Sequence, residues 1–258
     1  MKLVPDLLVL SGVKRGYTDM RRPSAHECSS CHSTSKGIFC DLNNSVLGEL
    51  SKLRQCIMYP PGSVVFMEGE QARAAYCICS GRLKRSSSSA EGRVLIHGFS
   101  TPGDVLGVRA LLLGKPHDLT AEAVEATELC LFPKDEFIPF IKQNGDISLR
   151  VAQKLSLDLY EAYSRVRGTA LKGSSERLAE LLLRLCHSHG KATPKGISLD
   201  ANLCQDELAA LLGISRRSLN RLLAELRVQG VIECRRRSIL VRNITALRKR
   251  LSLVELPA

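Results

Sequence analysis

Apolar residues follow two different periods along this chain, and the change of period divides it into parts. Between residues 53 and 133, short runs of Val, Ile, Leu and Cys alternate with Gly-containing turns, as in AAYCICSGRLKRS and LTAEAVEATELCLF. Such runs at regular spacing predict the strands of an all-β sandwich or roll. From about residue 147 apolar residues recur every three or four positions, which predicts helices. We therefore expect an α+β protein whose β-roll precedes a helical half.

The segment LCQDELAALLGISRRSLNRLLAELRVQGVIECRRRSILV, residues 203–241, carries the most specific pattern. One apolar helical face ends at Gly213, where a tight turn needs a positive φ, and Ser215 is placed to cap a second helix. That second helix is expected to bury Leu219, Leu222, Leu223 and Leu226. Two helices joined by a Gly-containing turn predict a helix-turn-helix, in which the start of the second helix meets base edges.

Basic residues concentrate around this pattern. The chain has a formal net charge of +11, and residues 201–258 hold 11 Lys and Arg against 5 Asp and Glu. The sequence VIECRRRSILV predicts two short strands joined by an arginine-rich turn, a wing suited to phosphate contacts, which supply affinity rather than sequence choice. The alternative for the whole segment is a solvated, arginine-rich helical hairpin without a ligand. We expect double-stranded DNA as partner, contacted by Gln205, Arg216, Arg217, Ser218, Arg221, Arg235, Arg236 and Arg237.

A long helix is expected before this segment, over about residues 147–171. Its apolar residues recur at spacings of three and four, as in the seam of a two-stranded coiled coil. The alternative is a helix that packs only on its own domain. Since helix-turn-helix proteins usually bind two half-sites, we favour a homodimer. The expected interface residues are Ala152, Leu155, Leu159, Ala162 and Val166.

The chain contains no apolar run long enough for a membrane span, and its first residues do not read as a signal peptide. We therefore expect a cytoplasmic protein without a membrane partner, in a reducing compartment that keeps its ten cysteines out of disulfides. Met20 is an alternative to Met1 as the translation start.

The order of β-roll, long helix and winged helix-turn-helix resembles the CRP/FNR superfamily of bacterial transcription regulators over about residues 40–245. PGDVLG is similar to the family's glycine turn in the roll, and GISRRSLNRLL to its recognition helix. The resemblance implies a roll of the double-stranded β-helix, cyclic-nucleotide-binding type, and RNA polymerase as a further candidate partner. The expected parts are a disordered leader (1–24), a cysteine-rich arm (25–45), the roll (46–145), the dimerisation helix (146–172) and the DNA-binding domain (173–250).

Two departures from the family pattern change the expected ligands. Where members that bind cyclic AMP carry a Glu for the ribose and an Arg for the phosphate, this chain has Val108 and Asp118. An aspartate repels a cyclic phosphate, so we do not expect a cyclic nucleotide. Arg221 matches the family's guanine-reading Arg, whereas Arg217 replaces a Glu that can accept from cytosine. The operator is therefore expected to differ from the family's familiar half-sites.

The N-terminal segment AHECSSCHSTSKGIFCDL suggests a metal centre. FNR-type members bind an oxygen-labile [4Fe–4S] cluster through an N-terminal C-x2-C…C group and one distant cysteine at the end of the roll. By this resemblance the ligands here are Cys28, Cys31, Cys40 and Cys130. Zinc held by the same thiolates or by three of them with His26 or His32, redox-active thiols, and a merely buried Cys130 remain alternatives. The other cysteines are interpreted as structural: Cys56, Cys77, Cys79, Cys186, Cys204 and Cys234.

Together these features predict a sequence-specific transcription regulator that senses oxygen, redox state or nitric oxide through an iron–sulfur cluster. The same fold with a small-molecule effector, a zinc site or a thiol switch is the main alternative. A cupin-like metal enzyme is a distant one, because the roll offers only His97 and His117 as histidine ligands. No nucleophile–base pair or phosphate-binding glycine motif is recognised in the sequence, and we do not expect an enzyme.

Overall fold

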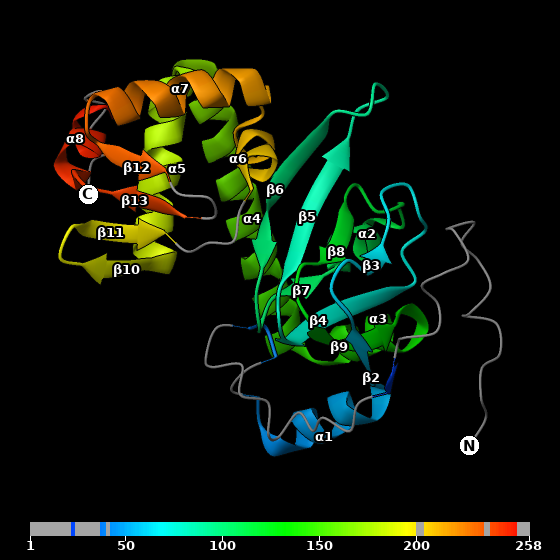
Figure 1. Cartoon of the computed structure of the whole chain (residues 1–258). Helices are drawn as coiled ribbons and strands as arrows, with labels where there is room; N and C mark the ends of the chain where they lie inside the picture. Colours follow the sequence, from blue (N-terminus) through cyan, green and yellow to red (C-terminus); the bar gives the residue numbers. More distant parts are fainter. Residues whose placement is uncertain (1–21, 24–36, 40–41, 200–203, 235–237, 252–258) are drawn as a thin grey trace. The chain divides into compact units, whose positions relative to one another are not determined.

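The computed structural model describes residues 22–23, 37–39, 42–199, 204–234 and 238–251. Most of the expected leader and of the cysteine-rich arm, including Cys28, Cys31 and Cys40, therefore lies outside the described residues. Arg22 and Pro23, expected within a disordered leader, instead form a short strand that pairs with residues 57–58. The chain divides into two compact units, residues 1–83 with 100–144 and residues 84–99 with 145–258. Figure 1 labels most of the helices and strands of both units.

The first unit is built on a five-stranded antiparallel sheet with the order β1-β2-β9-β4-β7. Its long strands are β2 (Gln55–Tyr59), β9 (Thr127–Pro133) and β4 (Ala74–Ser80). The short strands at its edges are β1 (Arg22–Pro23) and β7 (Val105–Leu106). The register sets Cys130 of β9 opposite Cys56 on one side and Cys77 on the other. The sheet thus brings together cysteines that lie far apart in the sequence.

Successive residues of β9 and β4 point to opposite faces of this sheet, as strand geometry requires. Leu129, Leu131 and Ile78 belong to the roll's apolar core, with Phe66 and Leu83 among their neighbours. The opposite face is covered by α3 (Lys134–Gln143), which packs on β4 and β9, and α1 (Asn44–Leu53) packs on α3. In Figure 1 both helices lie beside this sheet.

On this second face a cluster of aromatic rings joins the strand to the helix and to the arm. The Phe132 ring of β9 lies 5.9 Å from the Phe137 ring of α3 and 5.1 Å from the Phe39 ring, measured between centroids. Phe132 and Phe137 are fully buried. Because Phe132 is two residues from Cys130 along β9, the packed Phe39 and Cys130 lie on the same face of the sheet.

A second sheet completes the roll, with the order β3-β8-β5-β6. Its strands are β3 (Val64–Phe66), β8 (Thr120–Ala123), β5 (Leu83–Ser88) and β6 (Val94–Ser100). The glycine turn of PGDVLG leads into α2 (Val108–Leu113) through Gly107, whose φ is 82°. A Cβ at Gly107 would lie 2.8 Å from the Ala74 carbonyl oxygen, so both backbone conformation and space require glycine there.

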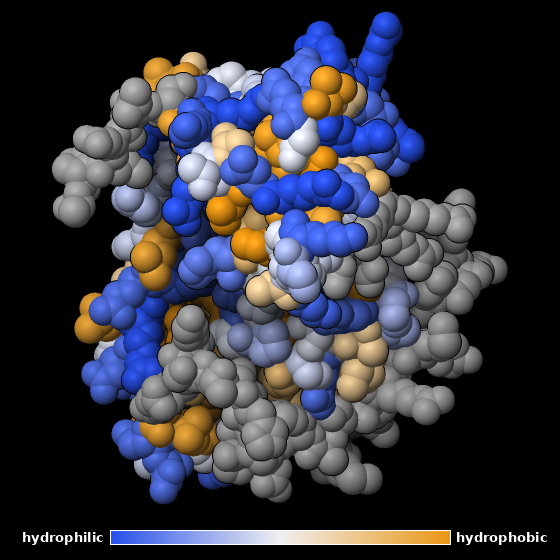
Figure 2. All heavy atoms as spheres, turned by 60° about the vertical axis from the view of Figure 1, so that its left-hand side comes forward, coloured by the Kyte–Doolittle hydropathy of each residue, from blue (hydrophilic) through white to orange (hydrophobic). Residues whose placement is uncertain are grey.

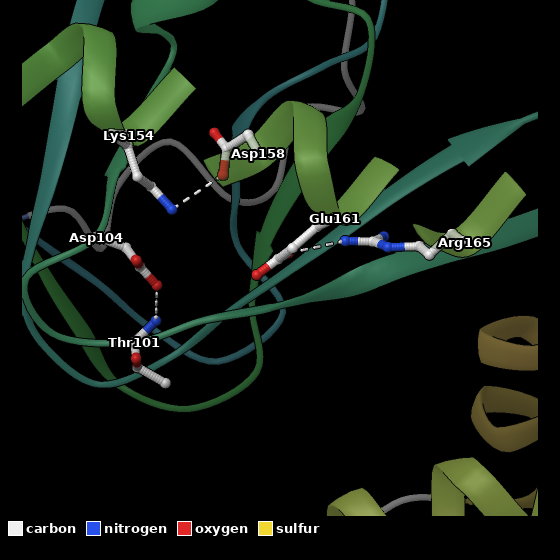
Figure 3. A network of polar contacts seen from close by, with 6 residues as sticks. All are labelled: Thr101, Asp104, Lys154, Asp158, Glu161 and Arg165. Atoms are coloured by element: carbon white, nitrogen blue, oxygen red, sulfur yellow. Dashed lines mark hydrogen bonds and ion pairs between the residues drawn. The ribbon is translucent and has the colours of Figure 1, made fainter. Parts of the chain in front are cut away.

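The second unit begins with the β5–β6 hairpin and α4 (Gly145–Leu171), a 27-residue helix that confirms the expected one and starts two residues earlier. One face of α4 carries two ion pairs at i,i+4 spacing, Lys154–Asp158 at 3.0 Å and Glu161–Arg165 at 3.3 Å (Figure 3). Arg165 also donates to the backbone oxygen of His97 in β6.

Figure 3 also shows the bond from the Thr101 amide to Asp104, 2.9 Å long, which closes the turn before β7.

The DNA-binding domain occupies the rest of the second unit. It consists of α5 (Ser174–His189), the hairpin β10 (Gly190–Thr193) and β11 (Gly196–Leu199), α6 (Gln205–Leu212), α7 (Arg216–Val228), the hairpin β12 (Ile232–Cys234) and β13 (Ile239–Val241), and α8 (Ile244–Lys249). Its four strands form one antiparallel sheet with the order β10-β11-β13-β12. The sequence predicted α6, α7 and the second hairpin but missed the first hairpin and α8. No helix among the described residues is both long and apolar enough to cross a membrane.

Candidate DNA-binding surface and sensor site

The helix-turn-helix is built by local signals that the sequence displays. Gly213 ends α6 in the left-handed region with a φ of 63°, and its amide bonds the Ala210 oxygen. Ser215 caps α7 by accepting from the Ser218 amide at 3.2 Å. The four leucines expected inside α7 are all buried in one core with α5, α6 and both hairpins. Arg177 of α5 secures the turn by donating to the Leu212 oxygen at 3.0 Å.

This packing leaves the basic face of α7 exposed to solvent. Arg216, Arg217 and Arg221 are exposed, as is Gln205 at the start of α6. Arg216 is held against α6 by an ion pair with Asp206 at 3.1 Å, and the Ser218 hydroxyl lies 2.9 Å from that of Ser215. Two of the predicted DNA-contact residues, Arg216 and Ser218, therefore already bond to side chains of the helix-turn-helix itself. This distinguishes them from Arg217 and Arg221. In the view of Figure 2 hydrophilic side chains cover much of the visible surface, with apolar patches between them.

The structure describes both strands of the wing hairpin but not the turn between them. Strands β12 and β13 pair from Ile232 opposite Val241 to Cys234 opposite Ile239. Arg242 clamps the hairpin through two bonds to Glu233, at 2.6 and 3.2 Å. The three arginines assigned to phosphate contacts, residues 235–237, lie outside the described residues, so only the strands that carry them are seen.

Several exposed apolar side chains of α4 form a stripe opposite its ion-paired face, whereas Leu157 and Tyr160 are also exposed but lie outside it. Leu149, Leu159, Tyr163 and Val166 are each 55–64% exposed, whereas Ile147 and Val151 are buried. Three members of the predicted interface, Ala152, Leu159 and Val166, fall on this stripe. Leu155 is half-buried, and Ala162 lies beside the stripe. The stripe includes two large residues that the sequence pattern missed, Leu149 and Tyr163.

The place expected for a cyclic nucleotide carries a different chemistry. Val108, at the expected ribose position, is buried at the start of α2, and Arg109 forms an ion pair with Asp118 at the expected phosphate position. Both charged side chains are more than half exposed. Next to them the buried ring of His117 stacks on Phe66, with 3.9 Å between the ring centroids. Burial lowers the pKa of His117, and this outweighs the opposing effect of nearby Glu70 and Asp118. The imidazole is therefore neutral near pH 7.

The cysteine face of the five-stranded sheet departs from expectation. Cys130 is 2% exposed and is joined to Cys56 by a disulfide between β9 and β2. The Sγ of Cys79 lies 3.2 Å from the Sγ of Cys130. The expectation that no cysteine forms a disulfide is thus wrong for this pair, because the strand register sets the two residues directly opposite each other. Cys56, interpreted as structural, is one partner of this bond.

The other described cysteines are thiols. Cys186 and Cys234 lie in or against the core of the DNA-binding domain, and burial raises the pKa of both thiols. Cys204 is exposed at the start of α6. Of the four predicted cluster ligands only Cys130 lies within the described residues. Among described residues no group of three or more His, Cys, Asp or Glu side chains is arranged to hold a metal ion.

Comparison with known proteins agrees with this architecture. Residues 56–144 match the cyclic nucleotide-binding domain, and residues 176–250 match the Crp-like helix-turn-helix domain. The chain is 26% identical over 214 residues to the CRP-like cAMP-activated global transcriptional regulator of Mycobacterium tuberculosis, covering 83% of this chain and 96% of that protein. It is 29% identical over 169 residues to the anaerobic regulatory protein of Bacillus subtilis, covering 65% and 71% of the two chains.

A solved structure shares the fold. The c-di-GMP responsive global regulator CLP of Xanthomonas campestris superposes with a TM-score of 0.72 at 19% identity, over 78% of this chain and all of that one. A cyclic nucleotide-binding roll followed by a Crp-like helix-turn-helix defines a class of transcription regulators. The chain belongs to the CRP/FNR family. It is a DNA-binding regulator rather than an enzyme, and helix-turn-helix regulators of this family bind DNA and act as dimers.

Proposed function

We propose that this regulator senses oxygen or a related oxidant through a [4Fe–4S] cluster held by Cys28, Cys31, Cys40 and Cys130, and reads its operator with Arg217 and Arg221. The observation that carries the sensing proposal is the packing of Phe39 on Phe132. Phe39 directly precedes Cys40 in the sequence, and Phe132 shares a sheet face with Cys130. The arm is therefore anchored on the face from which Cys130 projects.

The donor chemistry of these residues suits the cluster. Thiolates are the ligands that iron–sulfur centres take, and a shielded site next to aromatic rings limits the access of solvent. When bound, such a cluster supplies an iron centre that reacts with oxygen or nitric oxide. Cys130 can act as a ligand only when its bond to Cys56 is reduced. The Bacillus subtilis relative named an anaerobic regulatory protein is consistent with an oxygen-linked signal.

A cyclic nucleotide is not the signal under this proposal. A cyclic phosphate placed beside Asp118 would have to compete with that carboxylate for Arg109, its ion-pair partner. The buried Val108 offers no polar group to a ribose hydroxyl. The Mycobacterium tuberculosis relative is named for activation by cAMP, so the two chains are expected to differ in effector.

The cluster proposal is tested by anaerobic purification of the full chain, followed by iron, sulfide and zinc analysis. About four iron and four sulfide per chain are expected, as in a [4Fe–4S] centre. Cys130→Ser is expected to lose most of the iron, because serine is a poor ligand for this cluster. Cys204→Ser, which removes an exposed thiol in the DNA-binding domain, is the matched control and should retain it. Stoichiometric zinc without sulfide, or iron retained by Cys130→Ser, would contradict the proposal.

For dimerisation we propose a seam at the exposed stripe of α4. Leu149, Ala152, Ser156, Leu159, Tyr163 and Val166 follow one another at spacings of three and four, which is the a/d pattern of a two-stranded coiled coil. In this register Lys154, Asp158, Glu161 and Arg165 lie at positions opposite the seam, consistent with their ion pairs. Leu155 and Ala162, expected from the sequence pattern as core residues, become flanking ones.

Tyr163→Asp is expected to convert the dimer largely to monomer at micromolar concentration, because it places a charge in the apolar seam without a partner. Ala162→Asp is the matched control. It adds the same charge one residue away at a solvent-facing position, and it should leave the protein dimeric. Sedimentation velocity separates the two. A dimeric Tyr163→Asp together with a monomeric Ala162→Asp would favour the register expected from sequence instead.

A further inference from the structure

We propose that Cys56, Cys130 and Cys79 form a redox-active three-sulfur site that reacts with low-molecular-weight disulfides, in which Cys130 can pair with either of its two neighbours. All three residues belong to the first unit and to one face of its five-stranded sheet. The site is independent of the leader cysteines and of any metal.

The sheet makes Cys130 the shared partner. It lies on β9, with β2 and β4 on either side. The Cα atoms of Cys56 and Cys130 are 4.3 Å apart, and the Cys79 and Cys130 sulfurs are 3.2 Å apart. Cys56 and Cys79 lie on strands separated by β9, about 9–10 Å from each other at ordinary strand spacing. A disulfide cannot span Cα atoms more than about 7 Å apart, so these two cannot pair directly.

A strand irregularity gives Cys79 its position. The regular register sets Cys77, not Cys79, opposite Cys130, but the pairing of β4 with β9 shifts between Ile78 and Ser80. Such bulges re-aim side chains. As a result Cys79 contacts the Cys130 sulfur, whereas the Cys77 sulfur lies 4.0 Å from the Ile78 oxygen. The bulge therefore selects the second partner of Cys130.

Burial assigns the order of reaction. Cys130 is 2% exposed and Cys79 9%, whereas Cys56 is only half-buried. The Cys56 thiolate attacks one sulfur of a small disulfide, which forms a mixed disulfide and releases one thiolate. The Cys130 thiolate then attacks the Cys56 sulfur, forms the Cys56–Cys130 bond and releases the second thiolate. Two protein thiols are oxidised and one small disulfide is reduced to two thiols.

The third sulfur permits exchange without a further oxidant. When the Cys79 thiolate attacks Cys130, the Cys79–Cys130 bond forms, the Cys56–Cys130 bond breaks, and Cys56 leaves as the thiolate. The proton lost by Cys79 is balanced by the one that Cys56 takes up. The two products differ in which strand is tied to β9, namely β2 in one and β4 in the other.

Either disulfide removes the Cys130 sulfur from metal binding, so oxidation of this site would block loading of the proposed cluster. This consequence rests on the proposed function, whereas the redox site itself does not. Oxidised protein is then expected to take up iron only after reduction.

The site is tested by disulfide mapping in the full chain with Cys28, Cys31 and Cys40 replaced by serine. This chain is equilibrated in glutathione buffers of set disulfide content, acid-quenched, alkylated and digested without reduction. A peptide pair joined through Cys56 and Cys130 is expected. Adding Cys56→Ser should replace it, more slowly because the most exposed thiol is gone but to completion at equilibrium, with a pair joined through Cys79 and Cys130, and adding Cys79→Ser should leave the first pair unchanged. Adding Cys130→Ser should abolish both and leave glutathione on Cys56.

Cys204→Ser is the matched control, and it should not alter the map. Two results would overturn the proposal: a Cys130 that remains alkylatable in the most oxidising buffer, or a Cys56→Ser chain in which both Cys79 and Cys130 remain thiols. Neither of these two results depends on whether the Cys130→Ser variant folds. Iron uptake by the wild-type chain before and after oxidation separates this proposal from the previous one. If neither state takes up iron, the cluster proposal fails while the disulfide map stands.

Discussion

Arg221→Ala is expected to weaken binding of the dimer to its operator by about 30-fold or more. An arginine that reads a guanine contributes about 1–3 kcal/mol of discrimination, and a symmetric dimer makes the contact in both half-sites. The exposed position of Arg221 on α7, next to the buried face that fixes the helix, leaves its guanidinium available for this contact. The operator itself is obtained by selection from random-sequence DNA, and affinity is then measured by fluorescence anisotropy at fixed salt.

The control for Arg221 is Arg227→Ala. It removes the same charge from the last turn of α7, also at an exposed position. Only a small, sequence-independent loss is expected from Arg227, because base reading takes place at the start of the helix. An Arg221→Ala protein that loses the same factor on operator and on random DNA would show that Arg221 contacts phosphate rather than a base.

Leu219→Ala is expected to destabilise the DNA-binding domain by about 2–5 kcal/mol. Leu219 is fully buried in the core that joins α5, α6, α7 and the wing hairpin, so its truncation leaves a cavity behind the recognition helix. The change is measured by urea unfolding of the full chain, followed by circular dichroism. The loss is a large part of the stability of an ordinary small domain.

Val228→Ala, on the same helix, is the control for Leu219. Its side chain is 89% exposed, so its truncation removes little buried surface, and alanine is the better helix former. A shift within about 0.5 kcal/mol is expected, as for most surface substitutions. Equal shifts for the two variants would mean that the leucine face of α7 does not hold the domain together.

Local signals explain why the DNA-binding domain could be predicted well. The period of the leucines in α7, the glycine at position 213 and the cap at Ser215 act within a few residues, and the structure confirms all three. The same pattern could not fix which of two adjacent helical stripes of α4 is exposed. Leu155 and Ala162 fit a seam by spacing, but Leu155 is half-buried within the protein itself, whereas the large side chains of Leu149 and Tyr163 are exposed.

The cysteines show the opposite case, because their partners are set by strand register over long separations. Cys56 and Cys130 are 74 residues apart, and nothing in the local sequence around either of them predicts the bond. The ion pair of Arg109 with Asp118 likewise depends on how the chain folds back after α2. The sequence interpretation assigned Asp118 to the phosphate position, but it could not supply the arginine that pairs with it.

The sequence by itself determined the class of this protein, its order of parts, and the amphipathic faces and caps of its recognition unit, because those features depend on hydrophobic period and on hydrogen bonds between near neighbours. Only the tertiary structure decided which cysteines meet, which stripe of α4 remains exposed, and how Phe39 is anchored beside the strand that carries Cys130. These depend on sheet register and packing between distant segments, where a shift of one residue exchanges the two faces of a strand.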